Sequence, residues 1–451
     1  MKLKPYPEYK DSGVPWLGKI PAHWPEKRAK YYFKEVDERS ETGDEEMLSV
    51  SHITGVTPRS QKNVTMFKAE SNTGDKCCQP GDLVINTMWA WMSALGVSNH
   101  AGIVSPAYGV YRPINSQDYE NYYLDHLLRI GAYRSEYICR STGIRSSRLR
   151  LYPDKFLSMP VVCPPQSEQQ LIAQFLKAQD YLFRKFIRNK RRLIELLKEQ
   201  KENIINQAVT RGLDPNVKLK PSGVDWIGDI PDHWEVRRVG NFARVGNGST
   251  PSRSMPGYWL NGHFPWLNSS QVNRGFIDSA DQFVSSLALR ECHLPLLNKG
   301  TLLDIEATIN QHLAFIDIRN PIVSVEYLQK IFSASYNVLR SISDASGSTK
   351  GALTCDDIKK FKVPLPPINE QDQILLHTRI TTNAIDQTIT RAEREIELMR
   401  EYRTRLISDV VTGQVDVRDI EVPEVVKEDL LDLEEDSSEA MDDELEAGEE
   451  E

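Results

Sequence analysis

The feature that most constrains the fold of this chain is a thirteen-residue phrase that it contains twice. "SGVPWLGKIPAHW" at residues 12–24 returns as "SGVDWIGDIPDHW" at residues 222–234, with nine of the thirteen positions identical. The run "KLKP" at 2–5 also returns, at 218–221. A spacing of about 200 residues is far longer than the roughly 20 to 50 residues of a solenoid repeat. Each copy therefore belongs to at least one whole domain, and the length of 451 residues agrees.

Composition predicts a globular, soluble protein, with 40% hydrophobic and 26% charged residues. No apolar run approaches the roughly 18 residues of a membrane helix, and the first residues lack the apolar segment of a secretory signal. We therefore expect a cytoplasmic protein that has no membrane partner. The six cysteines show no C-x-x-C spacing, which predicts free thiols and no metal site.

The net charge of −9 is concentrated in the C-terminal tail. Residues 424–451 hold fifteen Asp and Glu against one Lys, so the other 423 residues have a net charge of +5. The tail is expected to be disordered because like charges repel and aromatic residues are absent. The alternative is that it competes, within the same molecule, for a basic groove.

The interiors of the two halves have the same kind of pattern but different residues. Short β-like runs occur at 47–55 and 80–88 in the first half, and at 266–275 and 299–307 in the second. Sequence identity falls away in these runs while the flanking phrases repeat. This combination indicates one scaffold that presents two different surfaces.

Each half ends in a long helical segment that follows a Pro-Pro pair. In "PPQSEQQ" at 164–170 and "PPINEQD" at 366–372, Ser167 and Asn369 are predicted to be the N-cap residues. Each helix is predicted to run for about 42 residues, or roughly 63 Å.

A helix of this length needs a partner for its apolar stripe. Apolar residues at alternating spacings of four and three predict a coiled coil between the two helices. The pairing positions are Phe183, Ile187, Ile194, Leu197 and Ile204 in the first helix, and Ile385, Ile389, Ile396, Met399 and Leu406 in the second. An antiparallel pair is favoured because a whole domain separates the end of one helix from the start of the next. The alternative is that each helix packs on its own domain.

The predicted fold is α+β, with two α/β domains separated by two long helices that pair as an antiparallel coiled coil, and a pseudo-two-fold internal repeat. The predicted parts are 1–163 (first domain), 164–211 (first helix), 212–365 (second domain), 366–413 (second helix) and 414–451 (acidic tail).

Two unlike surfaces held apart by a rigid spacer fit a DNA-binding protein whose half-sites lie about one helical turn apart. Arginines interleaved with hydroxyls precede the first helix, and a polar stretch occupies the same place before the second. The candidate DNA contacts are Arg140, Ser141, Thr142, Arg145, Arg148 and Arg150, and then Ser346, Ser348, Thr349 and Lys350. The alternative is that both stretches are solvated loops. The first helix also carries a basic run from Arg184 to Lys201, which predicts either a solvated face or phosphate contacts.

Together these features resemble the specificity subunit of type I restriction-modification systems. The resemblance rests on the duplicated "SGVxWxGxIPxHW" phrase and the "PPxxEQ" phrase at 164–169 and 366–371, and it covers residues 12 to about 420. It implies two target-recognition domains that each read one part of a split DNA sequence, with the coiled coil setting the gap. It also implies two adenine methyltransferase subunits, which bind the repeated regions, and two motor-nuclease subunits. S-adenosylmethionine, ATP and Mg²⁺ are expected on those partners and no cofactor on this chain.

Two other classes of protein are an enzyme with its own active site and a protein-binding scaffold. An enzyme with its own methyltransferase site needs an Asn/Asp-Pro-Pro-aromatic loop and a Gly-rich cofactor turn, and an ATPase needs a phosphate-binding loop; the sequence contains none of these. We therefore expect a subunit with no catalytic residues. A protein-binding scaffold is the remaining alternative. His23 and His233 are interpreted as structural residues because each lies in a turn-rich phrase beside a Trp.

Overall fold

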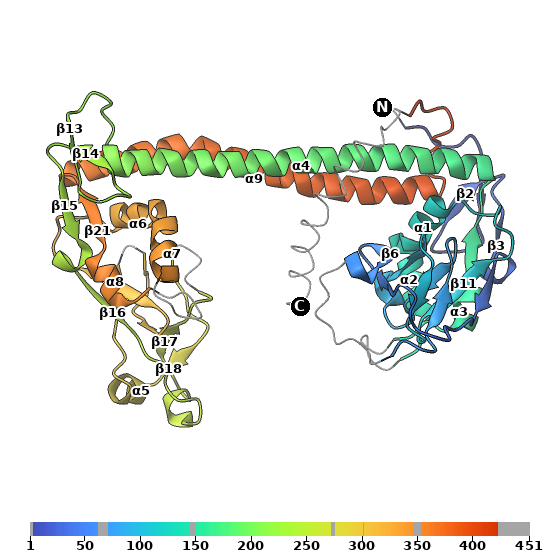
Figure 1. Cartoon of the computed structure of the whole chain (residues 1–451), viewed down its shortest axis with the longest axis horizontal. Coiled ribbons are helices and arrows are strands. Elements are labelled where there is room, and N and C mark those ends of the chain that lie inside the picture. The colour runs from blue at the N-terminus through green and yellow to red at the C-terminus, as the bar shows by residue number, and fades with distance from the viewer. Residues whose placement is uncertain are drawn as a thin grey trace. The chain divides into compact units, whose positions relative to one another are not determined.

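The computed structural model describes residues 3–61, 71–143, 149–271, 276–300, 302–345 and 353–422. The chain divides into two compact units (Figure 1). Unit 1 contains residues 1–191 and 394–451, and unit 2 contains residues 192–393. Each unit therefore takes part of both long helices.

Unit 1 is built around a four-stranded antiparallel sheet with the order β4-β11-β8-β9. Its strands are β1 (Tyr9–Asp11), β2 (Lys19–Pro21), β3 (Glu26–Arg28), β4 (Phe33–Val36), β5 (Leu48–Ser51), β6 (Gly55–Pro58), β7 (Lys76–Cys78), β8 (Leu83–Ile85), β9 (Leu95–Val97), β10 (Gly102–Val104), β11 (Gly109–Pro113) and β12 (Pro160–Val162). Its short helices are α1 (Asn121–Arg129), α2 (Gly131–Arg140) and α3 (Pro153–Leu157), with 3-10 turns η1 (Ala29–Tyr31), η2 (Arg59–Gln61) and η3 (Ala90–Met92).

Unit 2 repeats the outer elements of unit 1 and changes the inner ones. Its strands are β13 (Leu219–Pro221), β14 (Asp229–Pro231), β15 (Glu235–Arg238), β16 (Ala243–Asn247), β17 (Phe264–Leu267), β18 (Phe283–Val284), β19 (Thr308–Ile309), β20 (Ala314–Ile318) and β21 (Lys362–Leu365). Its helices are α5 (Ser286–Glu291), α6 (Val325–Ala334), α7 (Tyr336–Ala345) and α8 (Cys355–Lys360), with 3-10 turns η5 (Val239–Asn241) and η6 (Pro256–Tyr258). The ladders β15–β21 and β16–β20 correspond to β3–β12 and β4–β11. The expectation of one scaffold with two different interiors is therefore confirmed.

The repeated phrase folds the same way in both units. It forms the second strand of a hairpin, β1–β2 in unit 1 and β13–β14 in unit 2. Gly13 and Gly18 both have a φ of +71°, and Gly223 and Gly228 have φ values of +69° and +68°. This left-handed backbone is readily available only to glycine, which explains why these positions are identical in the two copies.

The two long helices are α4 (Gln166–Arg211, 46 residues) and α9 (Ile368–Val411, 44 residues). Both begin earlier than predicted, so the expectation that Ser167 and Asn369 are N-caps was wrong. The residue before each helix is the second proline of the pair, and its carbonyl accepts bonds from the amides of the third and fourth helical residues. The fixed φ of proline leads directly into a helix, so no side-chain cap is needed to define the start.

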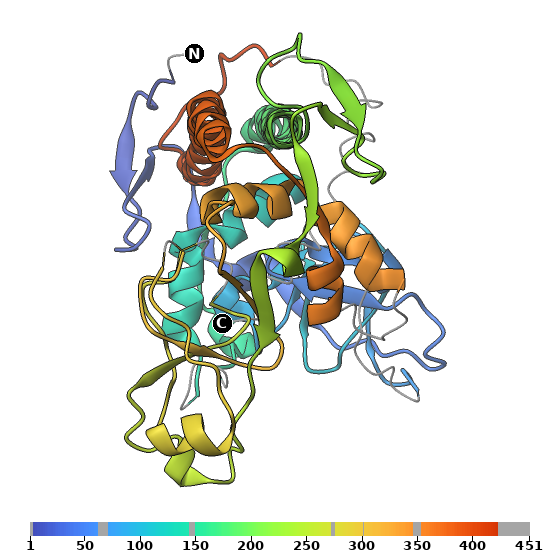
Figure 2. The ribbon, with the colours of Figure 1, turned by 90° about the vertical axis from the view of Figure 1, so that its left-hand side faces the viewer.

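Helices α4 and α9 lie side by side and antiparallel (Figures 1 and 2). In unit 1, Asp180 binds Arg403 at 2.6 Å and Lys190 binds Glu395 at 2.6 Å, so the partner number falls as the α4 number rises. In unit 2, Lys201 binds Asp386 at 2.5 Å. The predicted antiparallel coiled coil is therefore confirmed.

The ten predicted pairing residues are all buried or half-buried. Phe183, Ile194, Ile385, Ile389 and Leu406 are among the buried ones. Phe183 also meets the Tyr402 ring edge-on, with 5.9 Å between the ring centroids. At the end of α4, Ile205 is buried while Ile204 is only half-buried, because the helix there turns its apolar face toward the core of unit 2.

Each unit has its own hydrophobic core around its copy of the repeated phrase. Trp24 in unit 1 and Trp234 in unit 2 are fully buried. Residues 414–422 pack on unit 1, where Asp416 bridges to Lys4 and Val417 is buried. The rest of the predicted acidic tail, 423–451, lies outside the described residues. None of the helices in the described part of the chain has the length and apolar character of a membrane span.

Candidate nucleic-acid interface

A buried carboxylate explains the His-Trp pair of the repeated phrase in unit 1. Glu168, in the first turn of α4, accepts a 2.9 Å hydrogen bond from the indole Nε1 of Trp24 and contacts the His23 Nε2 atom at 2.5 Å. The hydroxyl of Tyr6 donates to the same carboxylate at 3.1 Å. A charged acceptor that is buried needs several donors, and the phrase supplies two of them.

Unit 2 repeats this arrangement. Glu370, in the first turn of α9, accepts a 3.1 Å bond from Trp234 Nε1 and contacts His233 Nε2 at 2.8 Å. The interpretation of both histidines as structural residues agrees with these contacts. We call the set Trp24, His23, Glu168 and Gln169, and its counterpart Trp234, His233, Glu370 and Gln371, the two anchors.

The glutamine of each anchor joins the start of its long helix to the segment that leads into a short helix, α1 in unit 1 and α6 in unit 2. Gln169 Nε2 donates to the carbonyls of Pro164 and Asp118, both at 2.8 Å, and its Oε1 accepts from the amide of Glu120. Gln371 makes the same three kinds of bond in unit 2, to Pro366, Ile322 and Ser324. Both amide groups are fully buried. In each unit the glutamate of the "EQ" pair binds the repeated phrase, and the glutamine binds the rest of the domain. These two roles explain why both residues are repeated.

A buried tyrosine of each unit holds the far end of the other long helix. In unit 1 the hydroxyl of Tyr123 donates to the carbonyl of Val411, at the end of α9, at 3.0 Å. In unit 2 the hydroxyl of Tyr327 donates to the carbonyl of Val209, near the end of α4, at 3.2 Å. Burial raises the pKa of both tyrosines, so they remain neutral donors. Each unit is therefore closed by the start of one long helix and the end of the other.

Two further charged groups, Asp416 and Arg418, lie beside the anchor of unit 1. Arg418 binds Asp416 at 2.6 Å and lies over the Tyr6 ring, 4.7 Å from its centroid. Burial, followed by the charge of Glu168, raises the pKa of Tyr6. Burial acts to raise the pKa of Asp416, but its hydrogen bonds to Arg418 outweigh this and lower it. These groups fasten residues 416–418 to the N-terminal segment.

Polar side chains gather in unit 2 where three strands end at one edge. Strands β17 and β19 are parallel and are followed by Asn268–Ser270 and by Asn310–His312, and β16 ends beside them. Backbone bonds join the three, from Ser249 to Ile309 at 3.1 Å and from Asn310 to Leu267 at 3.0 Å. Ligand sites commonly lie at the carboxyl ends of parallel strands. We call the segments 249–254, 268–270 and 310–312 the polar edge of unit 2.

The polar edge of unit 2 is held rigidly. Trp266 Nε1 donates to the carbonyl of Ser249, and Trp259 Nε1 donates to that of Ser252, each at 3.1 Å. The Arg253 guanidinium stacks on Trp259, 3.7 Å from the ring centroid. Thr250 donates to the side-chain oxygen of Gln311, which fixes the orientation of that exposed amide. An ordered Gln, Asn, Ser and Arg set is the chemistry of base and phosphate contacts.

Unit 1 has a different set of residues at the corresponding edge. Strand β8 ends before Asn86, and β11 begins after Tyr108; the amide of Asn86 donates to the Tyr108 hydroxyl at 3.1 Å. Thr87 Oγ1 donates to the carbonyl of Ala107 at 2.8 Å. We call the segments 86–89 and 105–108 the polar edge of unit 1.

The predicted DNA-contact loop of unit 1 lies against this edge. Thr142 and Arg150 form a two-bond antiparallel bridge, and the amide of Leu151 donates to the carbonyl of Thr87 at 2.9 Å. Both Thr142 and Arg150 are exposed. Arg140 instead binds Glu136 and Ser158 within the domain, and the Ser141 hydroxyl is buried. Outside the described residues lie Arg145, Arg148, Ser346, Ser348, Thr349 and Lys350.

At least four of the eight basic residues in the run from Arg184 to Lys201 bind carboxylates. Arg184 binds Asp180 at 2.8 Å and Arg192 binds Glu195 at 3.0 Å. Lys190 and Lys201 bind acidic residues of α9, as described above. These ion pairs are partly exposed, and each such pair contributes at most about 1 kcal/mol. Through Lys190 and Lys201, the run therefore contributes to the register in which α4 and α9 pair.

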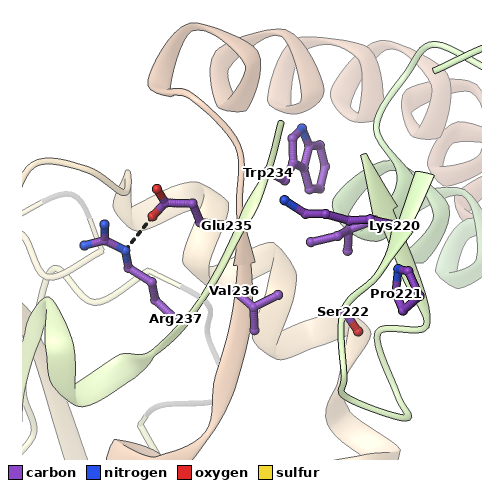
Figure 3. A pocket seen from close by; sticks show the side chains of 8 residues that line it. Lys220, Pro221, Ser222, Trp234, Glu235, Val236 and Arg237 are labelled. Atoms are coloured by element: carbon purple, nitrogen blue, oxygen red, sulfur yellow. Dashed lines mark hydrogen bonds and ion pairs between the residues drawn. The ribbon is translucent and has the colours of Figure 1, made fainter. Parts of the chain in front are cut away.

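A shallow hollow of about 350 Å³ lies on the repeated phrase of unit 2 (Figure 3). It is lined by Lys220, Ser222, Trp234, Val236 and Arg237 among others, and Arg237 Nε binds Glu235 at 2.7 Å beside it. Among the described residues, no three His, Cys, Asp or Glu side chains gather in a way that could hold a metal ion.

Sequence reasoning missed both polar edges. It placed the DNA contacts in the stretches just before the long helices and took 266–275 only as a β-like run. The signal that was present is the polar tripeptide "NQH" at 310–312 directly after a strand. Its meaning depends on β17 and β19 being parallel, which is a pairing that no local pattern encodes.

Comparisons with known proteins agree with this arrangement. Residues 231–391 match the type I restriction modification DNA specificity domain. The chain is 26% identical over 226 residues to the type I restriction enzyme MjaIX specificity subunit of Methanocaldococcus jannaschii, covering 46% of this chain and 50% of that protein. It is 29% identical over 202 residues to the EcoR124I/EcoR124II specificity subunit of Escherichia coli, covering 39% and 48%. The chain thus spans about half the length of these two curated relatives.

A solved structure extends the likeness to nearly the whole fold. A chain from a study of complex assembly and conformational transition of the type I R-M system matches with a TM-score of 0.64 and 15% sequence identity. The match covers 88% of this chain and 99% of that chain. At this level of identity the match establishes the fold.

Residues 231–391 therefore match a DNA specificity domain, and unit 1 repeats the anchor and the outer ladders of that segment. The chain is similar to the specificity subunits of type I restriction-modification systems.

Proposed function

We propose that this chain reads a bipartite, asymmetric DNA sequence, with each unit reading one half. The observation that carries the proposal is that both units share the same anchor and the same outer ladders but differ in the residues of their polar edges. A shared scaffold with unlike edges suits two separate base sequences. In this proposal the chain is not catalytic, and it directs adenine-N6 methylation and ATP-dependent cleavage by partner subunits.

The proposed base contacts come from the polar edges and the loops before the long helices. Asn and Gln pair with adenine through two hydrogen bonds, and Arg pairs with guanine in the same way. Gln311 is the leading candidate in unit 2, and Arg150 and Thr142 are the leading candidates in unit 1. Arg145, Arg148, Ser346, Ser348, Thr349 and Lys350 remain candidates on sequence grounds. We propose that Arg140 and Ser141 stabilise the loop and do not contact DNA.

We propose that the helix pair sets the length of the gap between the half-sites. The functional parts are then the recognition domains 1–163 and 212–365, the helices 164–211 and 366–413, and the tail 414–451. Adding seven residues to both helices keeps the apolar register and lengthens each helix by about 10 Å. The gap between methylated adenines should then grow, and an unchanged gap would reject the role as a spacer.

The proposed partners are double-stranded DNA, two adenine methyltransferase subunits and two motor-nuclease subunits. S-adenosylmethionine, ATP and Mg²⁺ then belong to those subunits. The methyltransferases are proposed to bind the repeated regions, and the hollow beside Trp234 provides a concave surface there. Adenine N6 must leave the base stack to be methylated, so the reader has to hold the duplex while the partner flips the base.

A salt titration separates this proposal from a protein-binding scaffold. The chain, copurified with its methyltransferase subunit, is titrated with duplex DNA at 50 and 200 mM salt. Binding that depends on phosphate contacts should weaken by about 10³-fold or more if six or more phosphates are neutralised. A complex with no salt-sensitive affinity for DNA would favour the scaffold.

The edge assignment is tested by Gln311→Ala, with Gln117→Ala as the matched control. Gln117 is an exposed glutamine of unit 1 that lies outside both polar edges. Mapping of N6-methyladenine should show relaxed sequence preference in the half-site of unit 2 alone for Gln311→Ala, because one good two-bond contact discriminates by about 1–3 kcal/mol. Gln117→Ala should leave both halves unchanged. Unaltered preference in both variants would remove Gln311 from the interface.

A further inference from the structure

One exposed tryptophan stands out on the polar edge of unit 1. Trp89 is 51% exposed, although it lies in a loop whose neighbours Asn86 and Ala90 are buried. Within segments 86–89 and 105–108, both fully described, it is the one large apolar side chain that is at least half exposed. It is also the one tryptophan of the eight in the chain, all of them described, that is more than half exposed, so its indole is available to a binding partner.

The loop that carries Trp89 is rigid, so the indole is presented in a fixed position. The carbonyl of Trp89 accepts bonds from the amides of Met92 and Ala94, at 2.9 and 3.2 Å. Trp91 Nε1 donates to the carbonyl of Met88, and Arg134 Nε donates to that of Trp91, both at 3.1 Å. Ser93 adopts a left-handed φ of +65°, which closes the turn. Little conformational freedom remains for the loop to lose when the indole is covered.

The surroundings of Trp89 favour nucleic acid over a protein surface. The Arg150 guanidinium lies 3.9 Å from the sulfur of Met88, the residue before Trp89, and both Arg150 and Thr142 are exposed. An apolar protein interface would surround the indole with further large exposed apolar side chains, whereas the other exposed apolar residues of the two edge segments are the small Pro106 and Ala107. An isolated aromatic ring with a cation beside it fits a nucleobase face next to a phosphate.

We propose that Trp89 stacks its indole on a nucleobase of the half-site read by unit 1, while Arg150 binds an adjacent phosphate. The inference rests on the proposed DNA-reading function and deepens it. It assigns to unit 1 a contact that senses how easily the duplex unstacks, in addition to hydrogen bonds with base edges. Unit 2 reads its half with the amide of Gln311 and its neighbours, so the two halves are recognised by different chemistry.

The test uses the copurified complex with the methyltransferase and a duplex that carries the mapped methylation site. Purines of the half-site of unit 1 are replaced, one at a time, by 2-aminopurine, whose fluorescence rises when it is unstacked from its neighbours. The variants are Trp89→Ala, Trp89→Phe and the control Tyr31→Ala. Tyr31 is an exposed aromatic residue that lies two positions before the start of β4, whereas the polar edge adjoins the opposite end of that strand.

We expect Trp89→Ala to bind the duplex at least tenfold more weakly, since a stacked base is worth about one to two orders of magnitude in affinity. At one 2-aminopurine position the wild-type complex should raise the fluorescence and Trp89→Ala should not. Trp89→Phe should keep part of both effects, and Tyr31→Ala should stay within about twofold of wild type. Methylation of the half-site of unit 2 at saturating protein reports that Trp89→Ala is folded.

Three results would overturn the proposal while leaving the proposed function intact. The first is Trp89→Ala affinity and fluorescence equal to wild type. The second is an equal loss for Trp89→Ala and Tyr31→Ala. The third is loss of the copurifying methyltransferase from Trp89→Ala, which would identify a protein contact. Absence of any salt-sensitive DNA binding by the wild type would instead reject the proposed function.

Discussion

Replacing the anchor glutamates by alanine tests how much the repeated phrase contributes to each unit. Glu168→Ala removes the acceptor for Trp24 Nε1 and the Tyr6 hydroxyl, both on side chains that are almost fully buried. A buried donor left without a partner costs about 1–3 kcal/mol. Two such donors give about 2–6 kcal/mol of lost stability in unit 1; the contact with the half-exposed His23 is not counted.

Glu370→Ala is the matched comparison in unit 2. It leaves one buried donor, Trp234 Nε1, and its other partner, His233, is half-exposed. The expected loss is about 1–3 kcal/mol, which is smaller than the loss for Glu168→Ala.

Native-state hydrogen exchange read by mass spectrometry provides the assay, because it reports the stability of each unit separately. Peptides covering α1 and α2 should lose protection in Glu168→Ala, and those covering α6 should lose it in Glu370→Ala. The loss should be confined to the unit that carries the substitution. Equal losses in the two variants, or a Glu168→Ala loss below about 1 kcal/mol, would refute the assignment of the glutamates as buried acceptors.

Two further perturbations follow from the structure. Gly413→Ala should destabilise the protein more than Gly212→Ala when compared by urea unfolding: both glycines have a positive φ, but an added Cβ at Gly413 would lie 2.4 Å from Pro21 Cδ, against 3.2 Å from the Trp234 ring at Gly212. A larger loss for Gly212→Ala would contradict this. Burial acts to raise the pKa of Asp125, but the nearby imidazole of His126, 3.8 Å away, and the Arg129 guanidinium lower it overall. Its contribution should therefore be complete above the unfolded pKa of about 3.9 and decline as the pH falls through the lower folded value, and Asp125→Asn should flatten the acid limb of a stability–pH profile.

The outer parts of the fold could be predicted because their signals are local. Backbone sterics explain the identical glycines and the Pro-Pro pairs. Helical spacing explains the apolar stripes of α4 and α9, which include Phe183 and Leu406. The two helix starts were misplaced because Ser167 and Asn369 have good capping side chains, whereas a preceding proline ends the irregular segment earlier. The partners of Glu168 and Glu370 could not be predicted, since each lies about 140 residues from the Trp that it binds.

The polar edges could not be predicted from the sequence for a related reason. Asn310 and Asn268 come together only because β17 and β19 run parallel, and parallel pairing joins strands that are distant in sequence. In unit 1 the nearness of Arg150 to Met88 depends on one backbone bond between residues 87 and 151. The stretch before α4 was still a useful prediction, because its two described ends, Thr142 and Arg150, lie at the edge that the structure reveals.

The most direct test of the account is an exchange of residues 25–160 for the equivalent segment of another specificity subunit. Both anchors and both long helices remain those of this chain, so the scaffold is preserved while the inner surface of unit 1 changes. Mapping of N6-methyladenine in cells that express the hybrid with its methyltransferase should show one half of the methylated sequence replaced, with the other half and the gap unchanged. A change in both halves, or methylation of one continuous sequence, would contradict two independent readers on a shared scaffold.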